Sequence, residues 1–155
     1  MNDKSEFSSQ SREVLNRYEL CGQFLVKGFV PFIPEYDAGV DFMLYREKDD
    51  SLLKVQLKSR WSVDRKYFGR NIWIAFPESG NESARAWFVV PHDLMVQHGK
   101  AKHSKTESWL KGIYHKPNLS ADLLNVYKEF AIDELVKLNK TQLNALTEGS
   151  ASEWN

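Results

Sequence analysis

The segment of residues 39–60, GVDFMLYREKDDSLLKVQLKSR, limits most strongly how this chain can fold. A β-rich run at 40–45, a charged turn at 46–51 and an alternating apolar and polar run at 52–59 predict a two-stranded hairpin. Successive side chains of a strand take opposite faces, so the apolar residues of the second strand face a core and the polar ones face away. The two sets are Leu53, Val55 and Leu57, and Lys54, Gln56 and Lys58.

The polar face of this hairpin predicts a site. Across the ladder, the first strand brings Asp41 to contact distance of Gln56 and Lys58. A carboxylate, an amide oxygen and an ammonium group then meet at one sheet edge, on a strand whose other face is apolar. Taken alone, Asp41 and Lys58 also fit a cross-strand ion pair without function, worth about 0.2–1 kcal/mol.

Length and composition predict a single globular domain over residues 1–155. Domains cluster near roughly 100–150 residues, and a chain of this size buries about 70% of its unfolded surface. The 42% apolar and 13% aromatic residues exclude a disordered chain. Residues 1–8 and 148–155 are expected to be loose termini.

The single cysteine and the absence of long apolar runs predict a cytoplasmic protein without a membrane span. Cys21 has no partner for an internal disulfide, which favours a reducing compartment. The first ten residues lack the apolar core of a signal peptide, and no run of about 18 apolar residues follows.

Basic charge is concentrated although the formal net charge is zero. Residues 54–70 hold six basic side chains against Asp64 alone, a net charge of +5. Because phosphate neutralisation acts over about a Debye length, such a run predicts nucleic-acid binding, while a solvated surface loop is the alternative reading. The expected nucleic-acid-binding residues are Arg60, Arg65, Lys66 and Arg70.

An amphipathic helix is predicted from the serines at 8, 9 and 11 to residue 27, with Gly28 as its stop. Glu19 lies at the margin of the apolar stripe, from which its carboxylate reaches a neighbouring sheet or pairs in solvent with Arg12 or Lys27. The stripe that we expect to face the core is Val14, Leu15, Tyr18, Cys21, Gly22 and Leu25.

The remaining pattern predicts an α/β domain. A short strand at 29–33 precedes the hairpin, an aromatic and basic loop follows at 61–71, and strands at 72–76 and 86–90 look central to the sheet. A helical turn is expected at 93–96 and a helix from a capping box of Ser104 and Glu107. Ser120 is expected to cap one or two further helices. The order of elements predicts a sheet flanked by helices.

Together these residues resemble the PD-(D/E)xK nuclease superfamily. The matching pieces are a helix with Glu19, then Gly39-Val40-Asp41 leading into a strand, then Gln56-Leu57-Lys58 on the partner strand. The resemblance covers residues 9–90 and extends to small bacterial members, including the intron-encoded homing endonuclease branch. It implies a restriction-endonuclease-like core, in which a central mixed sheet carries the site on a hairpin and is flanked by helices.

The resemblance also implies a Mg²⁺-dependent endonuclease that hydrolyses DNA phosphodiester bonds, with Mn²⁺ as a substitute and RNA not excluded as substrate. Asp41 would be the main metal ligand, with Glu19, the Gln56 amide and the Leu57 carbonyl completing the shell. Lys58 would orient the attacking water or stabilise charge on the phosphate. A homodimer or higher oligomer is expected, since cutting two strands usually takes two sites.

The sequence departs from the superfamily pattern at Gln56, where the usual residue is Asp or Glu. An amide oxygen still binds a hard cation but brings no negative charge. Two alternatives therefore stay open: a catalytically weak or inactive nuclease fold that binds nucleic acid, and a small α/β interaction module. Asp37, just before Gly39, is expected to shape the turn rather than to supply the missing charge.

Overall fold

The fold is α/β, with a mixed five-stranded sheet flanked by helices. A computed structural model describes residues 8–79, 85–148 and 153–155. Within them, no helix is long and apolar enough to cross a membrane. The elements in chain order are α1 (Ser9–Val26), β1 (Val30–Phe32), β2 (Phe42–Arg46), η1 (Glu47–Asp49), β3 (Ser51–Leu57), β4 (Trp61–Asp64), η2 (Arg65–Tyr67), β5 (Ile72–Pro77), β6 (Trp87–Pro91), α2 (His92–His103), α3 (Glu107–Lys111), β7 (Ile113–Lys116), α4 (Ala121–Tyr127), η3 (Lys128–Phe130), α5 (Ile132–Leu135) and α6 (Lys140–Glu148).

The predicted hairpin is formed by β2 and β3, which pair antiparallel with Phe42 opposite Val55. The turn between them is the short helix η1, closed by Asp50 in the left-handed conformation. Burial alternates along β3 as expected, because Leu53, Val55 and Leu57 are buried, Lys54 and Gln56 are half-buried and Leu52 is exposed. The periodicity of two therefore predicted correctly which side chains of β3 face the core.

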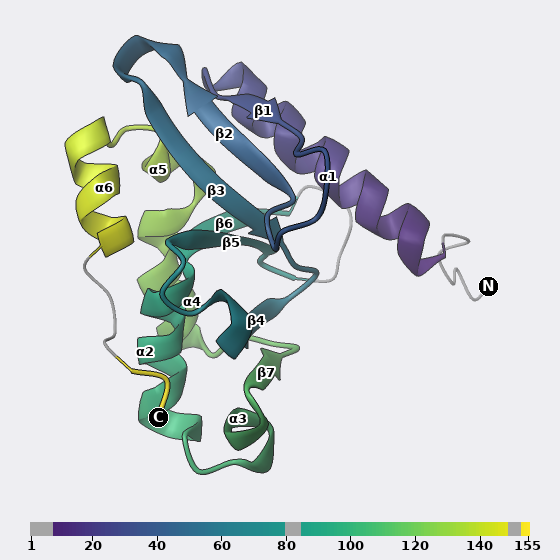
Figure 1. Cartoon of the computed structure of the whole chain (residues 1–155), viewed down its shortest axis with the longest axis vertical. Helices are drawn as coiled ribbons and strands as arrows, with labels where there is room; N and C mark the ends of the chain where they lie inside the picture. The colour runs from purple at the N-terminus through teal and green to yellow at the C-terminus, as the bar shows by residue number, and fades with distance from the viewer. Residues whose placement is uncertain (1–7, 80–84, 149–152) are drawn as a thin grey trace.

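The five strands of the main sheet lie in the order β1-β2-β3-β5-β6. β1 and β2, β2 and β3, and β5 and β6 pair antiparallel, whereas β3 and β5 run parallel. In the view of Figure 1, α1 runs beside β1 and β2, and α5 and α6 lie on the other side of the hairpin. The sheet is thus mixed, as the resemblance implied.

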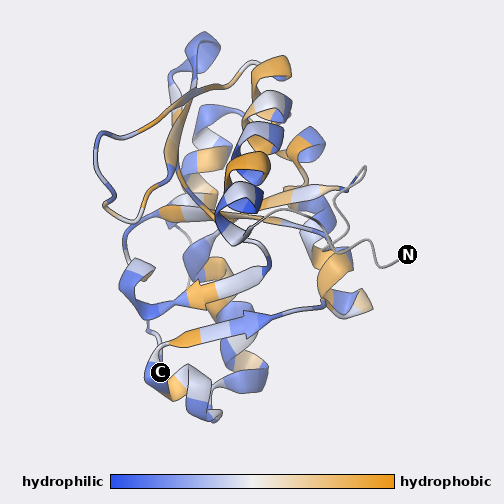
Figure 2. Ribbon diagram, turned by 90° about the vertical axis from the view of Figure 1, so that its right-hand side faces the viewer, coloured by the Kyte–Doolittle hydropathy of each residue, from blue (hydrophilic) through white to orange (hydrophobic). Residues whose placement is uncertain are grey.

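Helix α1 is capped by Ser8, whose hydroxyl accepts from the Ser11 N–H, but it turns a different face to the core than expected. Its buried residues are Asn16, Leu20 and Phe24. The apolar stripe assigned to the core contains Val14, Leu15, Tyr18 and Leu25, which are exposed instead. Figure 2 shows α1 in front of the sheet, with apolar segments along a ribbon that no other described element covers.

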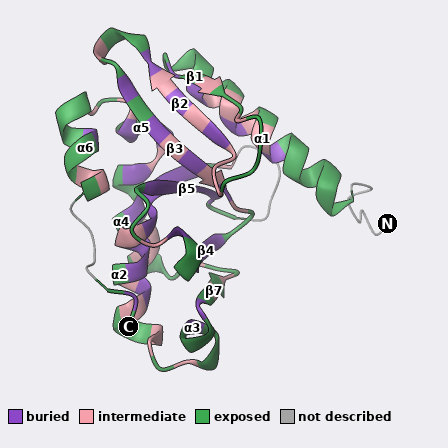
Figure 3. Ribbon diagram, viewed as in Figure 1, coloured by how far each residue is buried: buried purple, intermediate pink, exposed green. Residues whose placement is uncertain are grey.

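The core lies around β5 and β6, every residue of which is buried (Figure 3). The sequence predicted that β6 would be a central strand, but β6 is the last strand of the sheet. Phe88 forms a β-bridge with Ala131, and η3 and α5 also contact β6, so this edge strand is covered and can be apolar throughout.

A second, two-stranded sheet was not predicted. The expected loop at 61–71 contains β4, which pairs antiparallel with β7 so that Ser62 lies opposite His115. Trp61 anchors β4 by donating its Nε1 hydrogen to the Tyr127 hydroxyl at 2.8 Å. The pairing joins segments about fifty residues apart, so no local sequence pattern predicts it.

The later helices were predicted in part. Ser120 caps α4 as expected, its hydroxyl accepting from the Leu123 N–H. α2 extends over twelve residues instead of one turn. The cap of α3 is Thr106 and not Ser104.

The expectation of a loose C-terminus is wrong for Trp154. This side chain is 5% exposed and stacks on Trp109 with ring centroids 4.6 Å apart. Each indole N–H donates to the other residue's carbonyl, at 3.2 and 3.0 Å. Residues 1–7 and 149–152 lie outside the described residues.

Candidate functional site

Asp41 is fixed at the end of β3 by two main-chain contacts. Its N–H donates to the Val55 carbonyl at 2.9 Å, and its Oδ2 accepts from the Leu57 N–H at 2.7 Å. The turn before it is built by Asp37, whose Oδ1 accepts from the Gly39 N–H at 2.8 Å, as expected. Gly39 has φ +81°, and a Cβ there would meet Arg70 Nη1 at 2.9 Å, so only glycine fits. The backbone thus aims Asp41 at the polar end of the hairpin.

The carboxyl group of Asp41 is destabilised in its charged form. Burial raises the pKa of Asp41, and the nearby carboxylates Glu13 and Asp37 act in the same direction. The Leu57 N–H and the Arg17 guanidinium oppose this rise. A group of carboxylates around one partly buried acid is an environment that a cation would relieve.

Gln56, Leu57 and Lys58 lie on the wall of a hollow of about 370 Å³, and Asp41 is joined to this wall by its hydrogen bond with the Leu57 N–H. Helix α1 forms the opposite wall with Arg12, Glu13 and Asn16. Gln56 Oε1 is buried and has no hydrogen-bond partner among the described residues, which leaves an acceptor to be satisfied. The structure therefore brings together three of the four predicted residues, Asp41, Gln56 and Lys58, at one end of β3.

Lys58 does not form the cross-strand ion pair that was the alternative reading of Asp41 and Lys58. Its Nζ lies over the ring of Tyr67, 5.3 Å from the centroid, and no ion pair joins it to Asp41 in the described part of the chain. Its main-chain N–H donates to the Ala75 carbonyl at 2.8 Å. The ammonium is thus held by an aromatic face.

Glu19 does not join this group. Its Oε1 accepts from Trp87 Nε1 at 2.8 Å, and its Oε2 accepts from Arg85 Nη2 at 3.3 Å. Glu19 reaches the neighbouring sheet, as one reading of the helix predicted, but there it anchors β6 and Arg85. Both carboxylate oxygens are engaged away from Asp41, which argues against the expected metal-binding role of Glu19.

Glu13, and not Glu19, is the acidic residue of α1 that lines this hollow. It lines the hollow with Gln56 and Lys58, and its charge acts on the pKa of Asp41. The signal was present in the helix periodicity, because Glu13 continues the buried spacing of Asn16, Leu20 and Phe24 toward the N-terminus. Sequence reasoning missed it because the stripe of Val14 and Leu15 was assigned to the core.

A second hollow, of about 220 Å³, adjoins the first and shares Arg12, Asn16 and Ser59 with it. Arg60, Arg85 and Lys116 also line it, and Glu78 is the acidic residue in its lining. Arg85 is 4% exposed and is held by Asn16 Oδ1 and Glu19. Cationic side chains from four separate segments of the chain thus converge beside the Asp41 group.

Of the four predicted nucleic-acid-binding residues, Arg60 alone lies in this hollow. Arg65 donates to the Leu110 carbonyl at 3.2 Å and lies over the Trp154 ring. Lys66 lies 3.6 Å from Asp64 Oδ2, and Arg70 donates to the Ala38 carbonyl at 2.5 Å. Charge counting located the basic segment but did not distinguish the side chains that hold loops from those that face the site.

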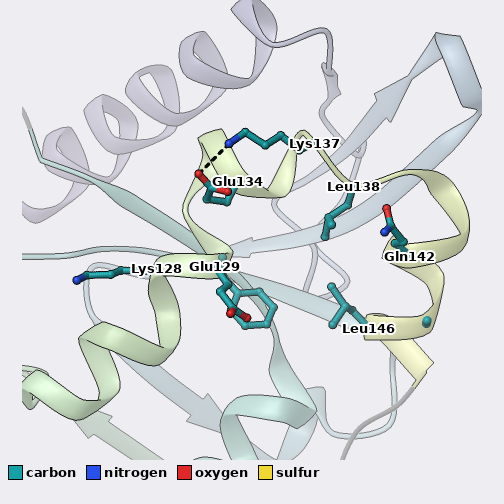
Figure 4. Close-up of a pocket in the computed structure, with 9 residues that line it drawn as sticks. Lys128, Glu129, Glu134, Lys137, Leu138, Gln142 and Leu146 are labelled. Carbon is teal, nitrogen blue, oxygen red and sulfur yellow. Dashed lines mark hydrogen bonds and ion pairs between the residues drawn. The ribbon is translucent and has the colours of Figure 1, made fainter.

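The largest hollow described, about 760 Å³, lies elsewhere, between η3, α5 and α6 (Figure 4). Phe130, Leu138 and Leu146 give it an apolar floor, and the ion pair of Glu134 with Lys137 lies at its rim. It contains none of the predicted site residues, and no buried side-chain polar atom in its lining lacks a partner among the described residues, so the end of β3 remains the better candidate for chemistry.

The donors near Asp41 suit a hard cation. Within the described residues, no group of three or more His, Cys, Asp and Glu side chains is arranged to hold a metal ion. Two carboxylates, Asp41 and Glu13, are nevertheless accompanied by the unpartnered Gln56 oxygen, and oxygen ligands of this kind are those that Mg²⁺ prefers. No protein-family model, curated protein or solved structure matches this chain.

Proposed function

We propose that this protein is a metal-dependent nuclease with a restriction-endonuclease-like core, acting on DNA phosphodiester bonds. The observation that carries the proposal is the buried, unpartnered Gln56 Oε1, because Gln56 lines a hollow with Glu13 and Lys58 and the neighbouring Leu57 N–H donates to Asp41. The raised pKa of Asp41, caused first by burial, supports the proposal, because the charged form of a buried carboxyl group is unfavourable and a bound cation would stabilise it.

In this proposal some residues hold the metal ion and others act on the phosphate or the attacking water. Asp41, held by the Leu57 N–H, and Glu13, from the facing helix, would hold a Mg²⁺ or Mn²⁺ ion together with the Gln56 oxygen and the Leu57 carbonyl. When bound, the ion supplies a Lewis acid for the phosphate oxygens and lowers the pKa of bound water. Lys58, held over Tyr67, orients the attacking water or stabilises negative charge on the phosphate.

The adjoining cationic hollow supports a nucleic-acid substrate. Arg60, Arg85 and Lys116 lie next to the Asp41 group, where they would neutralise phosphates flanking the scissile bond. Asn16 and Glu19 hold Arg85, so this guanidinium is positioned before substrate arrives. Asn16 and Glu19 are accordingly positioning residues and not metal ligands.

The test is cleavage of supercoiled plasmid and of single-stranded DNA, with Mg²⁺ or Mn²⁺ and with EDTA. Wild type is expected to nick or cut in the presence of the metal, and Asp41→Asn and Glu13→Gln are expected to lose at least 100-fold in rate, by analogy with the loss of one electrostatic group in other active sites. Glu107→Gln, on an exposed helix, is the matched acid control and should cleave like wild type.

The comparison of Glu13→Gln with Glu19→Gln tests the site assignment itself. Trp87 and Arg85 both donate to Glu19, and Glu19→Gln keeps only one acceptor oxygen for these two donors. It should therefore lower thermal stability while retaining cleavage within a few-fold. Loss of cleavage in Glu19→Gln with full activity in Glu13→Gln would reverse the assignment. Failure of wild type to cleave DNA with any divalent metal would contradict the proposed nuclease activity.

A second candidate function is nucleic-acid binding without cleavage. It is favoured by the neutral Gln56 and by the small number of carboxylates grouped in the described residues. Salt-sensitive DNA binding that Lys116→Gln weakens, without nicks under any metal, would support this reading. Absence of binding at low salt would instead favour an interaction module.

A further inference from the structure

Helix α1 carries an apolar stripe on the side that faces away from the sheet. Val14, Tyr18 and Leu25 follow one another at helical spacing, with Leu15 and Val26 beside them. Tyr18 is 74% exposed and Val26 is 80% exposed, although both belong to an otherwise well-packed helix. A contiguous row of large apolar side chains in water marks an interaction surface more often than a scattered one does.

The middle of the stripe is open. Gly22 lies one turn after Tyr18, and a Cβ built on it would meet nothing within 4 Å. The glycine therefore fills no tight space within this chain and is not required by backbone conformation, since its φ is not positive. Glycine in a helix interior costs about 1 kcal/mol relative to alanine. A close approach by another helix would account for its presence here.

The stripe is complementary to itself in one arrangement. If a second α1 runs antiparallel with residue 20 at the crossing point, Val14 lies opposite Val26 and Leu15 lies opposite Leu25. In the same register Tyr18 of each copy lies opposite Gly22 of the other, so a large ring meets the open position twice. A two-fold axis requires such reciprocal contacts.

We propose that this face of α1 is the surface through which two copies of the chain associate, with the two helices antiparallel. The proposal goes beyond the proposed nuclease function and does not depend on it. It gives the expected homodimer a defined interface.

Charge supports the antiparallel arrangement. The first turn of α1 contains no acidic residue, so the positive end of the helix dipole is not compensated within the helix. An antiparallel copy places the positive end of one helix beside the negative end of the other. A parallel copy would bring like ends together.

The available area suits a weak dimer. Tyr18 and the four aliphatic residues expose roughly 400–500 Å² per copy, about half of the 800 Å² that each partner buries in a standard interface. The remaining contacts must come from the residues around the stripe. A dissociation constant of roughly micromolar order is therefore expected rather than permanent association.

Dimerisation through this face leaves the candidate site open. Glu13 and Asn16, which line the hollow near Asp41, follow the buried spacing of Leu20 and Phe24. The stripe occupies a different side of the helix. Both copies of the site thus remain accessible in the dimer.

Sedimentation velocity across a concentration series tests the association. Wild type is expected to shift from the 18.0 kDa monomer toward twice that mass as concentration rises to about 100 times the dissociation constant. Gly22→Glu is the decisive variant, because the space around Gly22 is open and glutamate is the better helix former. It should raise the melting temperature of the monomer and weaken association at least tenfold.

Tyr18→Glu should weaken association similarly, and Tyr36→Glu is its matched control. Tyr36 is exposed to nearly the same extent, 76%, but lies outside the helix. Association that survives both Gly22→Glu and Tyr18→Glu would overturn the proposal, as would a wild type that stays monomeric at every concentration. If Tyr36→Glu alone abolished association, the interface would lie elsewhere than on α1.

Cross-linking tests the direction of the helices. With Cys21→Ser as background, a chain carrying both Val14→Cys and Val26→Cys should form a covalent dimer with a short bis-maleimide. Within one helix the two positions are about 18 Å apart, too far for that reagent. Each single cysteine variant should stay monomeric. A covalent dimer from Val14→Cys alone would show a parallel arrangement and contradict the proposal.

Discussion

Asp41 shows at the scale of one residue how a partly buried carboxyl group opposes stability. Its side chain is fixed by the Leu57 N–H, yet burial together with Glu13 and Asp37 raises its pKa. A carboxyl group whose pKa is higher in the folded than in the unfolded chain binds protons more tightly when folded. Its contribution favours folding at low pH and is lost as pH rises through the folded pKa, so at neutral pH the charged form destabilises the fold.

Asp41→Asn is therefore expected to raise the melting temperature at pH 7. The asparagine oxygen still accepts from the Leu57 N–H, while the buried charge is removed. The difference from wild type should shrink as pH falls below about 4, where Asp41 is protonated in both states. Calorimetry across this pH range is the measurement.

Added Mg²⁺ distinguishes a cation site from a merely buried acid. The ion should raise the melting temperature of wild type and leave Asp41→Asn unchanged, because ligands that bind only the folded state stabilise it. A wild type that is already more stable than Asp41→Asn at neutral pH would contradict the raised pKa.

At the scale of elements, the hairpin is tied to the C-terminal helices by one buried arginine. Arg46, at the end of β2, pairs with Asp49 at 2.7 Å and donates to the carbonyls of Val136 and Leu138 at 2.9 and 2.6 Å. The hydrogen bonds from Arg46 are the main cause that holds the pKa of Asp49 well below its usual range. The site-bearing hairpin and the segment after α5 are thus one connected unit.

Arg46→Leu should cost about 3–5 kcal/mol in free energy of unfolding, because it removes the donor to two carbonyls and the cation paired with Asp49. Urea denaturation measures this loss. Lys137→Gln, which removes an exposed ion pair with Glu134, is the control and should change stability by less than about 1 kcal/mol. A small effect of Arg46→Leu would mean that water replaces the lost contacts.

Elements whose pattern is local were predictable, and those set by distant contacts were not. The period of two in β3 and the serine caps of α1 and α4 were read correctly, because each depends on neighbouring residues. The pairing of β4 with β7 and the anchoring of Trp154 depend on residues distant in the chain.

The candidate site was predictable to the same extent. Asp41, Gln56 and Lys58 come from one hairpin, and the structure brings them together. The prediction of which acidic residue of α1 lies near Asp41 depended on which face of the helix packs on the sheet. Val14, Leu15 and Tyr18 form the more apolar stripe, but the core takes Leu20 and Phe24, so Glu13 and not Glu19 faces Asp41.

At the scale of the whole molecule, the C-terminus closes the lobe that holds β4, β7 and α3. Trp154 stacks on Trp109, and Phe68 and the Arg65 guanidinium also lie against its ring. Trp109 in turn lies against Gly99 of α2, where a Cβ would come within 2.7 Å of the indole. Residues from three separate segments, at 65–68, 99 and 109, are therefore connected through one side chain at the end of the chain.

Trp154→Ala is expected to lower the free energy of unfolding by about 3–5 kcal/mol, the usual cost of removing a buried tryptophan. The loss combines buried area, ring stacking and two hydrogen bonds between Trp109 and Trp154. Leu110→Ala, at an exposed position of α3, is the control and should change stability by less than about 0.5 kcal/mol. Hydrogen exchange should quicken first in β4 and β7, which are farther from the main sheet's core. Uniform exchange in Trp154→Ala, with an unfolding free energy like that of wild type, would mean that the C-terminus does not hold this lobe.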